Sequence, residues 1–74
     1  MDLTILAPGQ KGQVSCVCED GGRRLQDLGL IAGAEVRCLF QSPLGDPTAY
    51  QICGVTVALR KTDARKVLLE RIWD

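Results

Sequence analysis

The residues best suited to chemistry in this sequence are its four cysteines, Cys16, Cys18, Cys38 and Cys53. Cys16 and Cys18 stand one residue apart on one face of an expected strand, so their thiolates could share a soft metal ion if another segment or a second chain added ligands. Structural zinc sites usually contain two such close pairs, whereas Cys38 and Cys53 stand alone and the chain has no histidine. The pattern therefore favours free thiols over a metal or redox role, and disulfides come third.

The sequence offers little for enzymatic catalysis. It has no histidine and no glycine-rich phosphate loop before a helix, and neither Ser15 nor Ser42 has a base at an evident spacing. Several carboxylates fall at expected turns and helix ends, where they usually accept backbone hydrogen bonds: Asp20, Asp27, Asp46 and Asp63. We therefore expect a protein that is not an enzyme and holds no cofactor.

Length and composition indicate one folded domain over residues 1–74, because a 74-residue chain cannot divide its apolar side chains between two cores. Nine basic and nine acidic residues give no net charge, which argues against nucleic-acid binding. No apolar run approaches the roughly 20 residues that span a bilayer, and no basic segment precedes a hydrophobic stretch at the start. These features predict a cytoplasmic protein that does not insert into a membrane.

Turn residues recur at short intervals, and the segments between them alternate with the period of a strand. The alternation predicts a mainly β domain, a small bent barrel of about five or six strands. The expected strands cover residues 13–19, 34–42, 48–53 and 55–60, with short first and last strands at 3–6 and 67–73 that pair with each other.

One stretch, GGRRLQDLGL, breaks this period. Leu25 and Leu28 lie three residues apart, and Gly29 stands where a short helix needs a left-handed C-terminal residue. The stretch predicts a helix over about residues 22–28. A single helical turn is expected near residues 62–66, with Thr62 or Asp63 as its N-cap.

The expected core consists of large apolar side chains from these elements: Val14, Val17, Leu25, Leu28, Leu30, Val36, Leu39, Tyr50, Ile52, Val57, Leu59 and Val67. The first segment of interest is RRLQDLGLIAGAEV at residues 23–36. Its two-turn helix cannot bury all of four large apolar residues, so one or two of them could form an exposed patch suited to a partner: Leu25, Leu28, Leu30 and Ile31. The alternative is that all four pack inside.

A second segment, SPLGDPT at residues 42–48, is stiffened by Pro43 and Pro47. Leu44 at its tip has little reason to be apolar in a simple hairpin connection, so the loop is a second candidate for partner binding. The alternative is a rigid connection with no binding role.

These two segments, in this order and followed by GVTVALRKTDARKVLLE, resemble the FeoA family of bacterial ferrous iron transport accessory proteins. The combination of RxxxLGLxxGxxV, SPLGDP and a glycine before xVALRK is specific, and the similarity covers nearly the whole chain. The resemblance implies an SH3-like β-barrel with a short helix. It also implies a small cytosolic protein that docks on the cytoplasmic face of the membrane transporter FeoB, near its G-protein domain, and regulates or supports iron uptake.

The partner surface that the resemblance and the two segments together indicate is Arg23, Arg24, Leu28, Leu30, Leu44 and Asp46. The alternatives are a stand-alone metal-binding or redox module that uses the thiols, and a peptide-binding barrel that serves another protein. Self-association into a homo-oligomer, through an open sheet edge or an apolar helix patch, is a further expectation.

Overall fold

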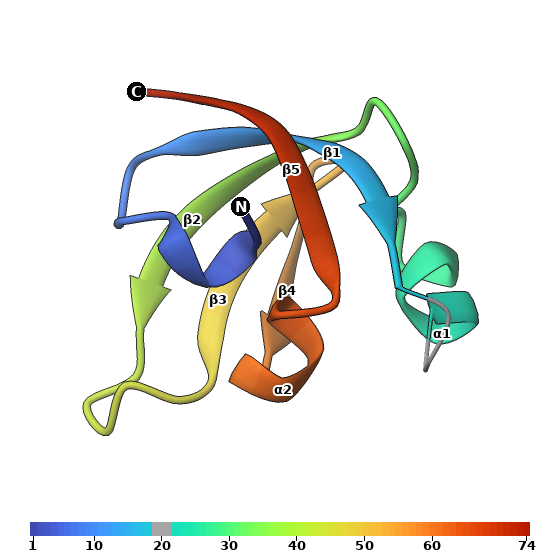
Figure 1. Ribbon diagram of the computed structural model, residues 1–74. Helices are drawn as coiled ribbons and strands as arrows, with labels where there is room; N and C mark the ends of the chain where they lie inside the picture. The colour runs from blue at the N-terminus through green and yellow to red at the C-terminus, as the bar shows by residue number, and fades with distance from the viewer. Residues whose placement is uncertain (19–21) are drawn as a thin grey trace.

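The computed structural model describes residues 1–18 and 22–74 (Figure 1). Its elements, in chain order, are η1 (Leu3–Ile5), β1 (Lys11–Val17), α1 (Gly22–Asp27), β2 (Glu35–Gln41), β3 (Thr48–Ile52), β4 (Val55–Leu59), α2 (Lys61–Ala64) and β5 (Val67–Trp73). The strands form one antiparallel sheet in the order β4-β3-β2-β1-β5. The predicted mainly β fold with one short helix is confirmed. Among the described residues, no helix has the length and apolar character needed to cross a membrane.

The sheet is strongly bent and stays open, whereas a barrel was expected. Register shifts interrupt the β1–β5 and β2–β3 ladders, and such bulges bend a sheet. β5 pairs with β1 on one side and meets the N-terminus on the other, where Asp2 bridges to Leu68 and the Leu69 N–H donates to the Met1 carbonyl at 2.8 Å. β4 pairs with β3 alone within the described chain.

The predicted first strand at residues 3–6 is wrong, because this segment forms the 3-10 turn η1. Leu3 and Leu6 lie three residues apart and are both buried, whereas Thr4 and Ile5 between them are exposed, a spacing that suits a helical turn and not a strand. Asp2 caps the turn, with its Oδ1 accepting the Thr4 N–H at 2.9 Å.

The helix α1 ends in a Schellman motif that explains the LGL sequence. The Gly29 N–H donates to the Gln26 carbonyl at 2.9 Å, the Leu30 N–H donates to the Leu25 carbonyl at 3.2 Å, and Gly29 has φ +104°. In this motif the residue after the left-handed glycine packs against the residue five positions earlier, here Leu30 against Leu25. Both leucines have no exposed area, so the motif fixes α1 to the core.

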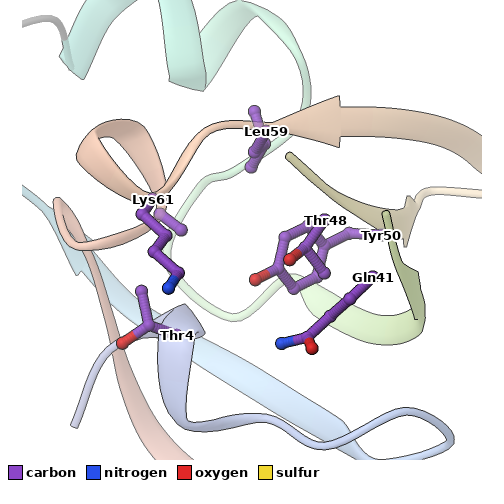
Figure 2. Close-up of a pocket in the computed structure, with 7 residues that line it drawn as sticks. Thr4, Gln41, Thr48, Tyr50, Leu59 and Lys61 are labelled. Carbon is purple, nitrogen blue, oxygen red and sulfur yellow. The ribbon is translucent and has the colours of Figure 1, made fainter. Parts of the chain in front are cut away.

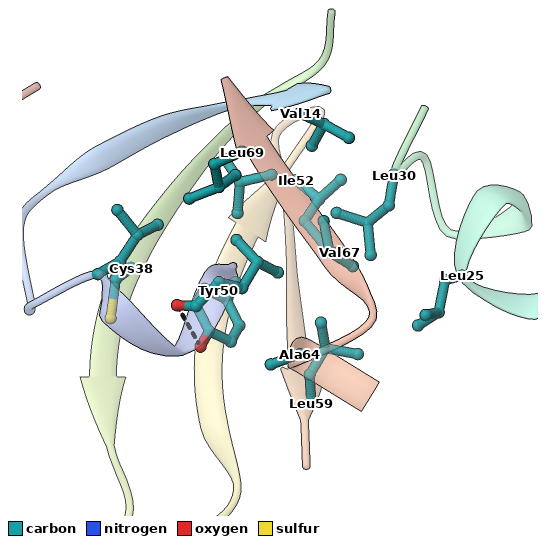
Figure 3. Close-up of a cluster of buried hydrophobic side chains, with 13 residues drawn as sticks. Val14, Leu25, Leu30, Cys38, Tyr50, Ile52, Leu59, Ala64, Val67 and Leu69 are labelled. Atoms are coloured by element: carbon teal, nitrogen blue, oxygen red, sulfur yellow. Dashed lines mark hydrogen bonds between the residues drawn. The ribbon is translucent and has the colours of Figure 1, made fainter. Parts of the chain in front are cut away.

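The core is a single cluster between the inner face of the bent sheet and the helical turns (Figure 3). The sequence correctly predicted eight of its buried members: Val14, Leu25, Leu30, Val36, Tyr50, Ile52, Leu59 and Val67. Four others expected there are only half-buried: Val17, Leu28, Leu39 and Val57. Cys38 is fully buried in place of Leu39, because Cys38 pairs with Tyr50 on the inward row and the β2–β3 register shift follows it. The strand expected over residues 13–19 includes Glu19, which lies outside the described residues.

Tyr50 is the polar member of the core, 2% exposed, and its hydroxyl donates to the Leu3 carbonyl at 3.3 Å (Figure 3). Burial, with a smaller effect from Cys38, raises the pKa of Tyr50 to about 12 from an ordinary 10.0. The folded protein therefore keeps a proton that the unfolded chain loses above pH 10.

We expect the free energy of unfolding to fall as the pH rises from 10 towards 12, by about 1 kcal/mol at pH 11. Urea unfolding at pH 9, 10 and 11 measures this loss. Tyr50→Phe is the control, because it cannot ionise and should retain only the smaller slope that the raised pKa of Cys38 produces. An equal slope in both proteins would contradict the prediction.

Candidate functional site

The short helix α2 joins the two segments that the sequence singled out for partner binding. On one side the Arg24 Nη2 of α1 lies 2.6 Å from the Asp63 Oδ2. On the other, the Asp46 Oδ1 accepts the Lys61 N–H at 2.9 Å. In Figure 1, α1 and the β2–β3 loop lie at opposite ends of the view with α2 between them. Among the described residues, α2 thus contacts both segments.

The prediction that Thr62 or Asp63 is the N-cap of α2 is wrong. The helical turn begins at Lys61, its N-cap residue is Arg60, and no side chain of the turn itself makes the capping bond. Asp46, fifteen residues earlier, satisfies the first N–H instead. Its carboxylate therefore makes the side chain to backbone bond expected at such positions. Asp20, for which the same was expected, lies outside the described residues.

The loop between β2 and β3 presents one large apolar side chain to solvent. The Gly45 N–H donates to the Ser42 carbonyl at 2.8 Å and the Ser42 N–H donates to the Pro47 carbonyl at 3.1 Å, so the loop closes on itself. Leu44 at its tip is 94% exposed. A closed loop that holds a leucine in water at its tip supplies an apolar anchor at little cost in ordering, which suits partner contact.

At α1, the structure divides the residues of the predicted surface. Arg23 and Arg24 are exposed and Leu28 is half-buried. Leu30 has no exposed area, so its assignment to the surface is wrong: as the second residue of the Schellman pair it belongs to the core. Of the four large apolar residues of this segment, Ile31 is the exposed one, at 55%. This agrees with the expectation that one or two of them are exposed, but Ile31 was not in the predicted partner surface. The residues that remain candidates for partner binding, called the docking surface below, are Arg23, Arg24, Leu28, Leu44 and Asp46, together with Lys61 of α2.

A small pocket beside α2 was not found from the sequence. Its enclosed volume is about 20 Å³ and it opens to solvent, and Figure 2 shows side chains from η1, β2, β3 and α2 around it. Its walls are Thr4, Gln41, Thr48, Tyr50, Leu59, Lys61 and Ala64. Gln41 and Thr48 flank the β2–β3 loop and pair across the ladder, so the pocket lies at the base of the loop that carries Leu44.

All four cysteines are free thiols, as the spacing favoured. Cys16, Cys18 and Cys53 are exposed and Cys38 is buried, where burial raises the pKa of its thiol. Within residues 1–18 and 22–74, no group of three or more histidine, cysteine or acidic side chains is placed to hold a metal ion. Cys16 and Cys18 could provide two ligands, half of what a tetrahedral site requires.

The bent antiparallel sheet, the short helix α1 and the helical turn before the last strand define the class: a small SH3-like β domain. The FeoA domain model matches residues 1–71. The chain belongs to the FeoA domain family, which is a family of accessory proteins for ferrous iron transport and not a known enzyme family.

Solved structures of FeoA proteins are similar over almost the whole chain. The FeoA protein from Chlorobium tepidum is 34% identical with a TM-score of 0.85, over 93% of this chain and 68% of that one. Stenotrophomonas maltophilia FeoA, described as a prokaryotic SH3 domain protein and complexed with zinc, is 32% identical with a TM-score of 0.85, over 95% and 89%. A FeoA-like protein from Clostridium acetobutylicum is 28% identical with a TM-score of 0.88, over 95% and 84%. Among curated protein sequences, none matches.

Proposed function

We propose that this protein acts in the cytoplasm by docking on the GTPase-bearing cytoplasmic part of a FeoB-type membrane transporter, where it supports or regulates ferrous iron uptake. The observation that carries the proposal is the ordered loop that holds Leu44 in solvent, connected through Asp46 and α2 to the arginines of α1. Membership of the FeoA family supports iron transport as the process. The apolar anchor and the charged groups beside it support a protein partner.

The proposal predicts that Leu44→Glu weakens binding to the purified cytoplasmic part of FeoB by at least about tenfold, because a charge replaces the apolar anchor. Isothermal titration calorimetry measures the change. The substitution should leave folding intact, since Leu44 is 94% exposed, and circular dichroism with urea unfolding verifies this.

Val55→Glu is the matched control. Val55 is also exposed and apolar, at 59%, and pairs with Ile52 at the end of the β3–β4 hairpin opposite the loop, so it adds the same charge away from Leu44. Because the β3–β4 turn also lies beside the end of α1, we expect a loss of affinity much smaller than that of Leu44→Glu. Wild-type affinity in a folded Leu44→Glu protein would remove the loop from the interface and, with it, the observation on which the proposal rests.

A further inference from the structure

The pocket at the base of the β2–β3 loop has one charged group in its wall, the ammonium of Lys61. Figure 2 shows this ammonium directed into the pocket with the side chains of Gln41 and Thr48 on the opposite wall. Among the described residues, ion pairs join Lys11 to Glu35 and Arg24 to Asp63, and Lys61 takes part in neither. The pocket therefore holds a cation with no carboxylate of residues 1–18 or 22–74 at ion-pair distance.

The hydrogen-bonding groups of the pocket divide into those already used and those still available. The Tyr50 hydroxyl donates to the Leu3 carbonyl, and the Thr4 hydroxyl donates to the Asp2 carboxylate. The Lys61 ammonium and the Gln41 carboxamide make no hydrogen bond with another described side chain or backbone group. Three ammonium and two amide N–H groups are thus free to donate to a guest, and the hydroxyl of Thr48 lies beside them.

Two carboxylates lie outside the wall but near Tyr50, whose pKa they help to raise, and they oppose an anionic guest. Each carboxylate already accepts hydrogen bonds from nearby groups. The Asp46 Oδ1 accepts the Lys61 N–H, and the Asp2 Oδ1 accepts the N–H and hydroxyl of Thr4. Neither belongs to the pocket wall. The groups available to a guest are the ammonium and the amide, whose N–H donors are complementary to a carboxylate, because the Thr48 hydroxyl already bonds with Tyr50.

We propose that this pocket binds the carboxylate of an aspartate or glutamate side chain of the docking partner, held by Lys61 and Gln41 over the apolar floor of Leu59 and Ala64. The enclosed space is only about 20 Å³, enough for one water-sized group such as a carboxylate oxygen, so a partner would insert the tip of an acidic side chain and not a whole ligand. Gln41 and Thr48 of the pocket wall pair at the base of the loop that carries Leu44, so a partner bound to this loop has the pocket beside it. This inference rests on the proposed function for the identity of the partner, but its chemistry is testable on the domain alone.

The test is a titration of the ¹⁵N-labelled domain, at constant ionic strength, with propionate, which carries the carboxylate of a glutamate side chain. We expect saturable shifts centred on the Lys61, Gln41 and Thr48 backbone amides and the Gln41 carboxamide. In Lys61→Gln the affinity should fall at least several-fold, and the fold should hold because Lys61 is exposed. Propionamide, the neutral analogue, and ethylammonium, a cation, are the matched ligands that should not bind.

Absence of pocket shifts with propionate up to 200 mM would overturn the proposal. Equal binding of propionamide, or of ethylammonium because Asp2 and Asp46 dominate the local charge, would overturn it as well. The partner is tested separately: Lys61→Gln should weaken binding to the cytoplasmic part of FeoB by at least about fivefold. Propionate binding with an unchanged FeoB affinity in Lys61→Gln would remove the partner from the inference. Propionate binding by a domain with no FeoB affinity at all would overturn the proposed function and leave the carboxylate site.

Discussion

Leu30→Ala should lower the free energy of unfolding by about 2–5 kcal/mol, the range for truncating a fully buried leucine. The reason is the Schellman motif at the end of α1, where Leu30 has no exposed area and the Leu30 N–H bonds to the Leu25 carbonyl. Domains of this length have about 0.05–0.15 kcal/mol of stability per residue, so about 4–11 kcal/mol in total. The substitution therefore removes a large part of the stability.

Ile31→Ala is the control for this prediction, because Ile31 is the next residue in the sequence and is 55% exposed. Its truncation should cost less than about 1 kcal/mol, as is usual at the surface. Urea unfolding followed by circular dichroism measures both variants. Similar losses for the two would show that the sequence LGLI packs as a unit and that the division between core and surface described here is incorrect.

The sequence already contains part of the information on which of Leu30 and Ile31 is buried. Gly29 was correctly expected to adopt the left-handed conformation that ends α1, and a glycine at this position places the following residue against the helix residue five positions earlier. That relation buries Leu30 and releases Ile31, whereas the prediction of a partner surface placed Leu30 outside. The number of apolar residues that a short helix can bury does not distinguish Leu30 from Ile31, whereas the geometry of its C-terminal motif does.

The N-terminal turn η1 is a second case in which a local sequence signal indicates the observed structure and the prediction is wrong. A strand was expected at residues 3–6 because the segment is apolar, but Asp2 stands two residues before Thr4, the spacing at which an aspartate accepts a backbone N–H at the start of a turn. Leu3 and Leu6 then share one face at a separation of three. A local capping signal was present and was outweighed by a hydrophobic pattern too short to distinguish a strand from a turn.

Other parts of the site depend on contacts that no local pattern contains. Asp46 caps α2 across fifteen residues, and Arg24 reaches Asp63 from a separate helix. The pocket combines side chains from η1, β2, β3, β4 and α2, so Lys61 could be recognised as a binding residue only after the sheet had brought these elements together. The sequence could predict the strands, α1 and the exposed loop because each depends on its own residues. The role of α2 as the connection between them follows from tertiary structure.

Gly29→Ala should also destabilise the domain strongly, by about 2–4 kcal/mol, from two separable causes. The first is the backbone: Gly29 has φ +104°, a conformation that L side chains rarely adopt. The second is space: a Cβ at Gly29 would lie 3.2 Å from the Cys53 Sγ and 3.2 Å from the Ile52 Cγ2, and Ile52 has no exposed area in which to move. Urea unfolding measures the sum of the two.

Gly33→Ala separates the two causes, because Gly33 has φ +88° but a Cβ there would meet no atom within 4 Å. It should cost only the backbone strain, about 1–2 kcal/mol. The excess at Gly29 should shrink when Cys53→Ala removes the sulfur, and a double-mutant cycle between residues 29 and 53 measures this coupling. A coupling energy of zero would place the whole cost in the backbone or against Ile52. A positive one would show that Gly29 is required partly because the β3–β4 turn packs against the end of α1, which holds the helix and its arginines at their place in the docking surface.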